Sequence, residues 1–429
     1  MGIDNKKSIK PVLMKRYFFV LLAVMASVLT GAAKPSKILL KEGLWKAVLQ
    51  RPDGQEIIFN FETVKESGRQ VIYVLNAEER LLVDSIRRSD DSIWIQMPFF
   101  ASGFAARVKK DGNLQGLYLK NYGNRIQQIP FYTVYGSKER YPSSAKAKYN
   151  VSGRWAINFL GKTTDDSVAV GEFKQAANGK ITGTLLAPSG DYRYLQGNIN
   201  GDSLKLSAFD GGHAVLFSAR IDKDSKTLSG GYLYSGLTIS EKWVATKNAS
   251  AKLNDGYDIT RLREGESKLN FSFPSTKGDV VSINDERFKN KVVVLQILGS
   301  WCPNCMDETG FLSTYYKQHH QKGVEIIGLA YERTADFEES RKALQSFQKR
   351  FDVQYPFLIT GAEVSDPKRT EKTLPQLEDI RAFPTTIFID KKGNVRKIHS
   401  GYNGPATGAH YEEFKKEFDE LINSLLQEG

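Results

Sequence analysis

Both cysteines of this 429-residue chain lie in one short segment, 299–305, and are separated by only two residues. An apolar, β-branched run at 292–298 precedes them, and a helical pattern at 306–321 follows. A cysteine at the start of a helix faces unpaired N–H groups and the positive end of the helix dipole, which favour the thiolate. The pattern therefore predicts a redox-active dithiol, in which Cys302 is the exposed, attacking thiol and Cys305 lies one turn further along.

Two other roles for the cysteine pair can be weighed against this prediction. A structural zinc site needs four ligands, and the five histidines provide no second pair with suitable spacing. A purely structural disulfide is the other alternative, but so small a ring at a helix start stabilises a long chain poorly. Dithiol exchange is favoured, and it needs no metal and no organic cofactor because electrons pass through the sulfur atoms of Cys302 and Cys305.

The N-terminal segment predicts export. Basic residues are concentrated before residue 17, an uninterrupted apolar run covers 17–29, and small residues follow as far as Ala33. This order is typical of a secretory signal peptide, and the apolar run is short for a membrane span. We expect residues 1–33 to be removed and the protein to reside in the periplasm or cell envelope, or to be membrane-anchored if the segment is not cleaved.

The formal net charge is +11, and basic and acidic residues are interspersed over most of the chain. Part of it belongs to the basic start of the predicted signal peptide, and no long basic run occurs after it. This distribution is typical of a soluble basic surface, so nucleic acid is not expected as a partner.

The region from about residue 39 to 246 has the pattern of strands and turns, and it contains an internal duplication. Gly43-Leu44-Trp45 recurs as Gly153-Arg154-Trp155, and further short matches follow in the same order at an offset of about 110 residues. We therefore predict an all-β region made of two related antiparallel repeats, each a small sandwich or barrel, or two halves of one larger barrel. The predicted ranges are 34–137 for repeat 1, 138–150 for a linker and 151–246 for repeat 2.

The β repeats carry no predicted catalytic site. Gly161-Lys162-Thr163 resembles the end of a phosphate-binding loop, but the required upstream glycine is absent. The tryptophans of this region are expected to be core residues rather than a ligand cage; they are Trp45, Trp94, Trp155 and Trp243. An alternative function stays open, in which the repeats bind a partner and the redox domain senses or regulates.

The remainder of the chain alternates strand and helix patterns after a polar linker at 247–266. Strand patterns occur at 280–283, 292–298, 324–330, 385–389 and 395–399, and helical patterns at 306–321, 336–350 and 411–426. This alternation predicts an α/β domain with a central mixed sheet over 267–429. The longer, polar stretch 361–379 is expected to be a surface loop.

From about residue 269 onwards, the chain resembles the TlpA/ResA-type thioredoxin family of exported thiol–disulfide oxidoreductases. The resemblance rests on Trp301-Cys302-Pro303-Asn304-Cys305, on Glu308 three residues later, and on Phe383-Pro384-Thr385, which matches the family's cis-proline loop. It implies a thioredoxin-like fold and reduction of cysteine-containing protein substrates, with electrons supplied by an upstream membrane protein. Cytochrome c maturation is one process in which such reductases act. Trp301, Pro303, Phe383 and Pro384 are then expected to form the substrate groove, and Cys305 to resolve the mixed disulfide.

Two departures from the thioredoxin pattern bear on proton transfer and redox potential. Gln296 occupies the place of the buried acid of thioredoxin, six residues before the first cysteine. Glu308 could take over that role, or it could be an ordinary acidic residue near a helix start. The residues between the cysteines, Pro303 and Asn304, differ from those of thioredoxin, so the redox potential stays open over a wide range.

Overall fold

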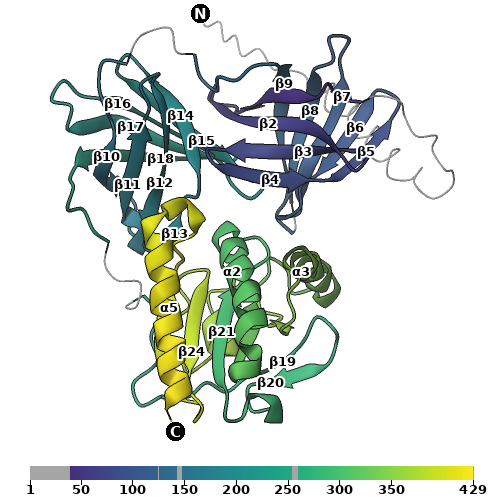
Figure 1. Ribbon diagram of the computed structural model, residues 1–429, viewed down its shortest axis with the longest axis vertical. Coiled ribbons are helices and arrows are strands. Elements are labelled where there is room, and N and C mark those ends of the chain that lie inside the picture. Colours follow the sequence, from purple (N-terminus) through teal and green to yellow (C-terminus); the bar gives the residue numbers. More distant parts are fainter. Residues whose placement is uncertain (1–38, 124, 143–146, 254–258, 429) are drawn as a thin grey trace, which may run out of the picture.

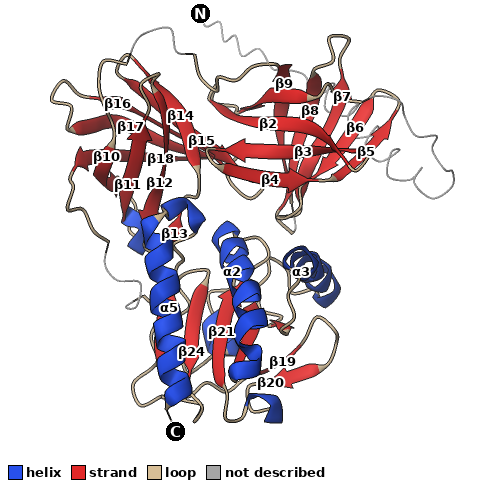
Figure 2. Cartoon of the chain, in the orientation of Figure 1, coloured by secondary structure: helices blue, strands red, loops and turns tan. Residues whose placement is uncertain are grey.

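The computed structural model describes residues 39–123, 125–142, 147–253 and 259–428. The predicted signal peptide at 1–33 lies outside the described residues. Two β units lie side by side and rest on an α/β domain (Figure 1). Within the described ranges, the α-helices belong to the α/β domain, and the two units above it are built mainly from strands (Figure 2). None of the described helices has both the length and the apolar composition needed to span a membrane.

The first β unit is an antiparallel sheet in the order β4-β3-β2-β1-β9-β8-β7-β6-β5. Strands that are consecutive in sequence are neighbours in the sheet, except for β4 and β5. Because β1 pairs with β9, the sheet curls into a barrel whose two edges are β4 and β5. Its strands are β1 (Gly43–Gln50), β2 (Glu56–Glu66), β3 (Arg69–Asn76), β4 (Glu79–Val83), β5 (Ser85–Ser89), β6 (Ser92–Gln96), β7 (Ser102–Val108), β8 (Leu114–Asn121) and β9 (Ile126–Tyr135).

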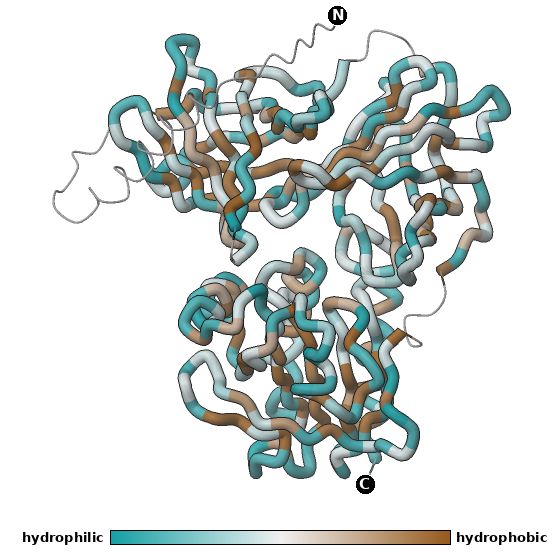
Figure 3. The backbone as a smooth tube through the Cα atoms, turned by 180° about the vertical axis from the view of Figure 1, so that it is seen from behind, coloured by the Kyte–Doolittle hydropathy of each residue, from teal (hydrophilic) through white to brown (hydrophobic). Residues whose placement is uncertain are grey.

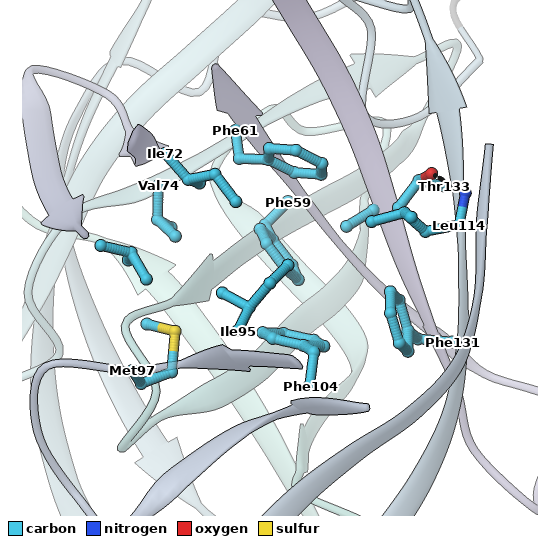
Figure 4. A pocket seen from close by; sticks show the side chains of 12 residues that line it. Phe59, Phe61, Ile72, Val74, Ile95, Met97, Phe104, Leu114, Phe131 and Thr133 are labelled. Carbon is cyan, nitrogen blue, oxygen red and sulfur yellow. Dashed lines mark hydrogen bonds between the residues drawn. The ribbon is translucent and has the colours of Figure 1, made fainter. Parts of the chain in front are cut away.

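Apolar side chains fill the interior of the first unit (Figure 4). Phe59 and Phe61 of β2, Phe104 of β7 and Phe131 of β9 point inward because alternate residues of each strand face the same side. The free space among these side chains is about 20 Å³, which is close to the volume that one water molecule needs. The interior is therefore a packed core rather than a ligand cavity.

The second β unit closes completely. Strand β11 pairs with both β10 and β12, so its sheet, β11-β10-β18-β17-β16-β15-β14-β12-β13, forms an antiparallel barrel. Its strands are β10 (Gly153–Phe159), β11 (Val168–Gln175), β12 (Lys180–Ala187), β13 (Gly190–Asp191), β14 (Leu195–Asn200), β15 (Ser203–Phe209), β16 (Ala214–Ile221), β17 (Thr227–Ser235) and β18 (Ile239–Lys247). A 3₁₀ turn, η2 (Asp165–Ser167), precedes β11.

The two β units are related, as the duplication predicts. Trp45 in β1 and Trp155 in β10 are fully buried, and each ring N–H donates to the carbonyl of the residue four positions earlier, at 3.1 and 2.9 Å. A glycine with positive φ lies two residues before each tryptophan. Each tryptophan also pairs with the last strand of its own unit, Trp45 with Tyr135 and Trp155 with Lys247. Equivalent residues therefore occupy equivalent places in the two barrels. Trp243 is also buried, whereas Trp94 is only half-buried.

The polar segment between the two β units is more than a spacer. Arg140, from the predicted linker 138–150, is buried between the units and donates to the carbonyls of Ser207 (2.6 Å) and Leu75 (2.5 Å). Beside it, the rings of Phe59 and Phe209 stack with centroids 4.2 Å apart. The guanidinium satisfies carbonyl groups that would otherwise be buried without partners, so the segment joins the two barrels.

The C-terminal domain has the predicted mixed sheet, in the order β23-β22-β21-β24-β25. Strands β21, β22 and β23 are parallel, and β24 and β25 are antiparallel to their neighbours. The strands are β21 (Val292–Leu298), β22 (Val324–Ala330), β23 (Phe357–Ile359), β24 (Thr385–Ile389) and β25 (Val395–Ser400). The helices are α2 (Pro303–His319), α3 (Phe337–Phe351), α4 (Arg369–Thr373) and α5 (Ala409–Gln427), with 3₁₀ turns η4 (Glu286–Phe288), η5 (His320–Lys322) and η6 (Pro405–Thr407).

Two details differ from the expectations for this domain. The strand pattern at 280–283 forms β20 (Val280–Ser282), but it pairs with β19 (Ser272–Pro274) in a separate two-stranded sheet. The stretch 361–379 contains the short helix α4, whose Thr370 and Thr373 are buried.

The β region and the C-terminal domain share apolar contacts. Phe99, in the loop between β6 and β7, packs against Phe347 and Phe351 of α3, with ring centroids 5.6 and 5.4 Å apart. Seen from behind, hydrophobic segments run through the interiors of all three units (Figure 3). The start of α2 points toward the two β units (Figure 1).

Replacing Arg140 with Met should weaken the association of the two barrels. The variant keeps the apolar stem but leaves buried carbonyls without a donor, so we expect the free energy of unfolding to fall by about 2 kcal/mol. Urea unfolding followed by circular dichroism measures this change. Lys65→Met, at an exposed position of β2, is the matched control and should change stability little. Equal stability of the two variants would contradict the structural role of Arg140.

Candidate active site

The two cysteines lie where strand β21 gives way to helix α2. Cys302 is extended (φ −101°, ψ 115°) and caps the helix, and Pro303 follows at the first helical position. This order is favourable because proline fits the first turn, where its missing N–H is not needed. The backbone N–H of Cys305 donates to the Cys302 sulfur at 3.2 Å. Both cysteines are free thiols, and a donor aimed at the Cys302 sulfur stabilises negative charge there.

The thiols are less accessible than the sequence pattern predicts. Cys302 is only 5% exposed and Cys305 is fully buried. The prediction of an exposed Cys302 is therefore wrong for this arrangement of the chain, because loops of the β units lie over the start of α2. Burial raises the pKa of the Cys305 thiol well above its usual range, and the neighbouring Cys302 and Glu308 act in the same direction.

Glu308 lies inside the domain rather than at an exposed helix end. It is fully buried and accepts hydrogen bonds from Thr386 (2.5 Å) and from the amide nitrogen of Gln296 (2.8 Å). Burial raises the pKa of Glu308 to about 7, although both hydrogen bonds oppose this shift. Gln296, at the place of the thioredoxin acid, thus fixes the orientation of the Glu308 carboxyl group. The reading of Glu308 as an ordinary helix-end residue does not fit this position.

The predicted proline loop faces the cysteines. The Phe383–Pro384 peptide bond is cis, and the carbonyl of Phe383 lies 3.4 Å from the Cys302 sulfur, which donates to it. Trp301 packs edge-on against the Phe383 ring at 5.3 Å, and its indole N–H donates to the carbonyl of Tyr331 at 2.8 Å. The structure therefore brings together Trp301, Cys302, Pro303, Cys305, Glu308, Phe383 and Pro384.

A half-buried cation, Arg333, lies beside the site and was not predicted from the sequence. The guanidinium of Arg333 lies over the rings of Trp301 (5.3 Å) and of Tyr122 from the first β unit (4.5 Å). Burial lowers the pKa of Arg333, and the charge of Cys302 raises it. Arg333 follows Glu332, which accepts from the N–H (2.8 Å) and hydroxyl (2.7 Å) of Ser300 just before the motif. No local pattern in the sequence marks these residues, because their partners are distant in the chain.

Among the described residues, no three His, Cys, Asp or Glu side chains are grouped so that they could hold a metal ion. We still predict that the site works with its two cysteines alone, without a metal or an organic cofactor.

Residues 263–413 match the Redoxin family model. The chain is 30% identical over 157 residues to the thiol-disulfide oxidoreductase ResA of Bacillus thuringiensis subsp. konkukian, covering 36% of this chain and 79% of that protein. The chain belongs to the ResA-like family of thiol–disulfide oxidoreductases. ResA of Halalkalibacterium halodurans is 29% identical over 166 residues, which is 38% of this chain and 80% of the relative. These matches make the C-terminal domain thioredoxin-like and the protein an oxidoreductase.

A solved structure of a putative thiol:disulfide interchange protein DsbE from Chlorobium tepidum is 18% identical, with a TM-score of 0.29. The match covers 38% of this chain and 99% of the solved chain. The family model and the two ResA relatives match only part of this longer chain, and the family model places that part in the C-terminal region.

Replacing Glu308 with Gln should change how stability depends on pH. Folding raises the pKa of Glu308 from its ordinary value of 4.5 to about 7. Between these values the folded chain holds a proton that the unfolded chain has lost, so the free energy of unfolding falls as the pH rises. Glu308→Gln lacks this titration, and its stability relative to the wild type should rise over the interval by up to about 3 kcal/mol.

Urea unfolding of wild type and variant near pH 5 and near pH 8 measures this difference. Glu338→Gln, at the exposed start of α3, is the control and should follow the wild type at both pH values. A stability difference between Glu308→Gln and wild type that does not change with pH would contradict the raised pKa of Glu308.

Proposed function

We propose that this protein is an exported reductase of protein disulfides that uses Cys302 and Cys305 as its dithiol. The observation that carries the proposal is the position of the Cys302 sulfur. It caps α2, accepts the N–H of Cys305 and lies against the carbonyl of Phe383, next to Pro384. A substrate strand at this loop would present its sulfur to Cys302. The basic and apolar N-terminal pattern supports export, and family membership supports exchange with cysteine-containing proteins.

The proposed reaction proceeds in two exchange steps. The Cys302 thiolate attacks one sulfur of a substrate disulfide, forming a mixed disulfide and releasing the other substrate sulfur as a thiolate, which takes up a proton. Cys305 then loses its proton and attacks the Cys302 sulfur, releasing the second substrate thiolate, which is protonated in turn. The substrate gains two electrons and two protons, and Cys302 and Cys305 are left as a disulfide. A dithiol on a membrane protein would return the pair to the reduced form.

The second step requires a group that takes the proton of Cys305. We infer that Glu308 has this role, since its charge acts on the Cys305 thiol and its own pKa is raised to about 7. A carboxyl group with a pKa near the working pH both accepts and returns a proton readily. Gln296 and Thr386 position it without removing its ability to titrate.

The two cysteines should differ in reactivity. Cys305 is fully buried with a raised pKa, whereas the Cys302 sulfur lies at the helix start and accepts an N–H. When reduced protein is treated with limiting iodoacetamide near neutral pH, alkylation should occur first at Cys302. Peptide mass spectrometry with time identifies the labelled cysteine. Faster labelling of Cys305 would contradict the assigned roles.

Cys305→Ser should trap substrates. Its hydroxyl is too weakly acidic to attack the mixed disulfide, so covalent adducts on Cys302 should accumulate in the cells that make the protein. Non-reducing gels should show larger species that disappear with reductant, and mass spectrometry should identify the clients, with cytochrome c precursors among those to be sought. Cys302→Ser is the matched control and should form none. Absence of adducts, under conditions in which the wild type reduces insulin, would favour the binding or sensing alternative.

A further inference from the structure

The backbone of the second β unit lies directly against the residues between the two cysteines. A Cβ atom added to Gly212, in the loop between β15 and β16, would lie 2.8 Å from the Pro303 ring and 2.9 Å from Phe100. A Cβ on Gly190, in β13, would lie 2.0 Å from the side-chain amide of Asn304. Such distances are too short for any side chain, so the second unit packs against the first turn of α2 without intervening space, and Phe100 of the first unit lies against Gly212.

This packing closes the usual approach to the dithiol. Thiol–disulfide exchange requires the incoming sulfur to reach the attacking sulfur directly. Loops of the first unit contribute Phe100 and Tyr122, and a loop of the second contributes Gly212, around Pro303 and Trp301. With Cys302 only 5% exposed, a disulfide in a folded protein cannot reach its sulfur in this arrangement.

A single buried guanidinium connects all three units at this place. Arg193, just before β14, makes ion pairs with Glu79 of the first unit, with Asp210 of its own unit at 3.2 Å, and with Asp307 of α2. We call these four residues the Arg193 cluster. The side chains of Arg193 and Asp210 are 4% and 3% exposed, and those of Glu79 and Asp307 are 12% and 14% exposed. Asp307 lies two residues after Cys305, so the cluster holds both β units at the dithiol.

The energetic consequence of removing Arg193 follows from its burial. Three acidic side chains share one buried cation, and the His213 ring lies 3.3 Å from Asp210. Without the guanidinium the carboxylates would repel one another at low dielectric, which is costly for buried groups. The units relieve that repulsion if they separate and admit water.

We propose that the two β units form the outer wall of the active site, that Arg193 is the positioning residue holding this wall on α2, and that the wall selects substrates by size. Small disulfides and extended, flexible segments reach Cys302 in preference to disulfides of folded proteins. The proposal rests on the proposed function in that Cys302 is taken as the attacking thiol.

The test measures access to Cys302 in the full-length chain that carries Cys305→Ser, so that only one thiol is labelled. Iodoacetamide is the small probe, and a maleimide on a polyethylene glycol chain is the bulky probe. Each rate is divided by the rate for free N-acetylcysteine. We expect the bulky probe to react much more slowly than the small probe, and Arg193→Met to raise the bulky-probe rate by about tenfold or more.

Two further variants keep this test decisive. Arg220→Met removes an arginine from a 74% exposed side-chain position in the same unit and should leave both rates unchanged. Gly212→Val keeps every charge of the Arg193 cluster, but its side chain would overlap with Pro303 and push the second β unit away from α2. This variant should therefore also raise the bulky-probe rate. Circular dichroism reports whether each variant keeps its barrels. Equal corrected rates of the two probes in the parent chain, or an unchanged rate ratio in both Arg193→Met and Gly212→Val, would overturn the proposal.

A turnover assay with Cys305 restored separates this proposal from the proposed function. Arg193→Met should raise the rate of insulin reduction relative to the rate with a small aromatic disulfide. Reduction of both substrates with the same ratio in the variant and the wild type would overturn the wall and leave the reductase function standing. A shifted labelling ratio, together with no reduction of either substrate by any variant, would support the wall and overturn the reductase function.

Discussion

The packing of the β units on the first turn of α2 is the constraint on which the rest of the site depends. The helix start must stay at the end of β21 so that its free N–H groups face the Cys302 sulfur. In this chain the same turn also contacts the second barrel, through Pro303, Asn304 and Asp307, and Arg193 connects it onward to Glu79 of the first barrel. Chemistry and domain association therefore use the same few residues, and a change in one alters the other.

Beneath that turn, burial accounts for the properties of the proton-transfer groups. Cys305 and Glu308 are both fully buried, and burial is the largest cause of the raised pKa of each. Gln296 is neutral, so it orients Glu308 without adding a second charge next to the thiols. An acid at position 296 would have placed two carboxyl groups in contact and separated their pKa values.

The sequence predicted those features that local patterns determine. The β-branched run before Cys302, the helical pattern after it and the shared Gly-x-Trp starts of the two repeats each depend on neighbours in the chain, and the structure confirms them. Burial of Arg140, the Gln296–Glu308 contact and the covering of Cys302 depend on residues that are far apart in sequence. No periodicity records such contacts, so the expectation of an exposed Cys302 was wrong, and the buried contacts of Arg140 in the segment 138–150 could not be foreseen.

The close approach of Gly190 and Gly212 to α2 restricts how the redox potential of the dithiol can change through substitution. The residues between the cysteines of such a motif adjust the stability of the thiolate and hence the redox potential. Here Pro303 and Asn304 are also in contact with the backbone of the second β unit. A bulkier residue at position 304 would collide with the second barrel, so substitution of Asn304 would require a compensating change near Gly190. The potential of the dithiol and the fit of the barrels are therefore expected to evolve together.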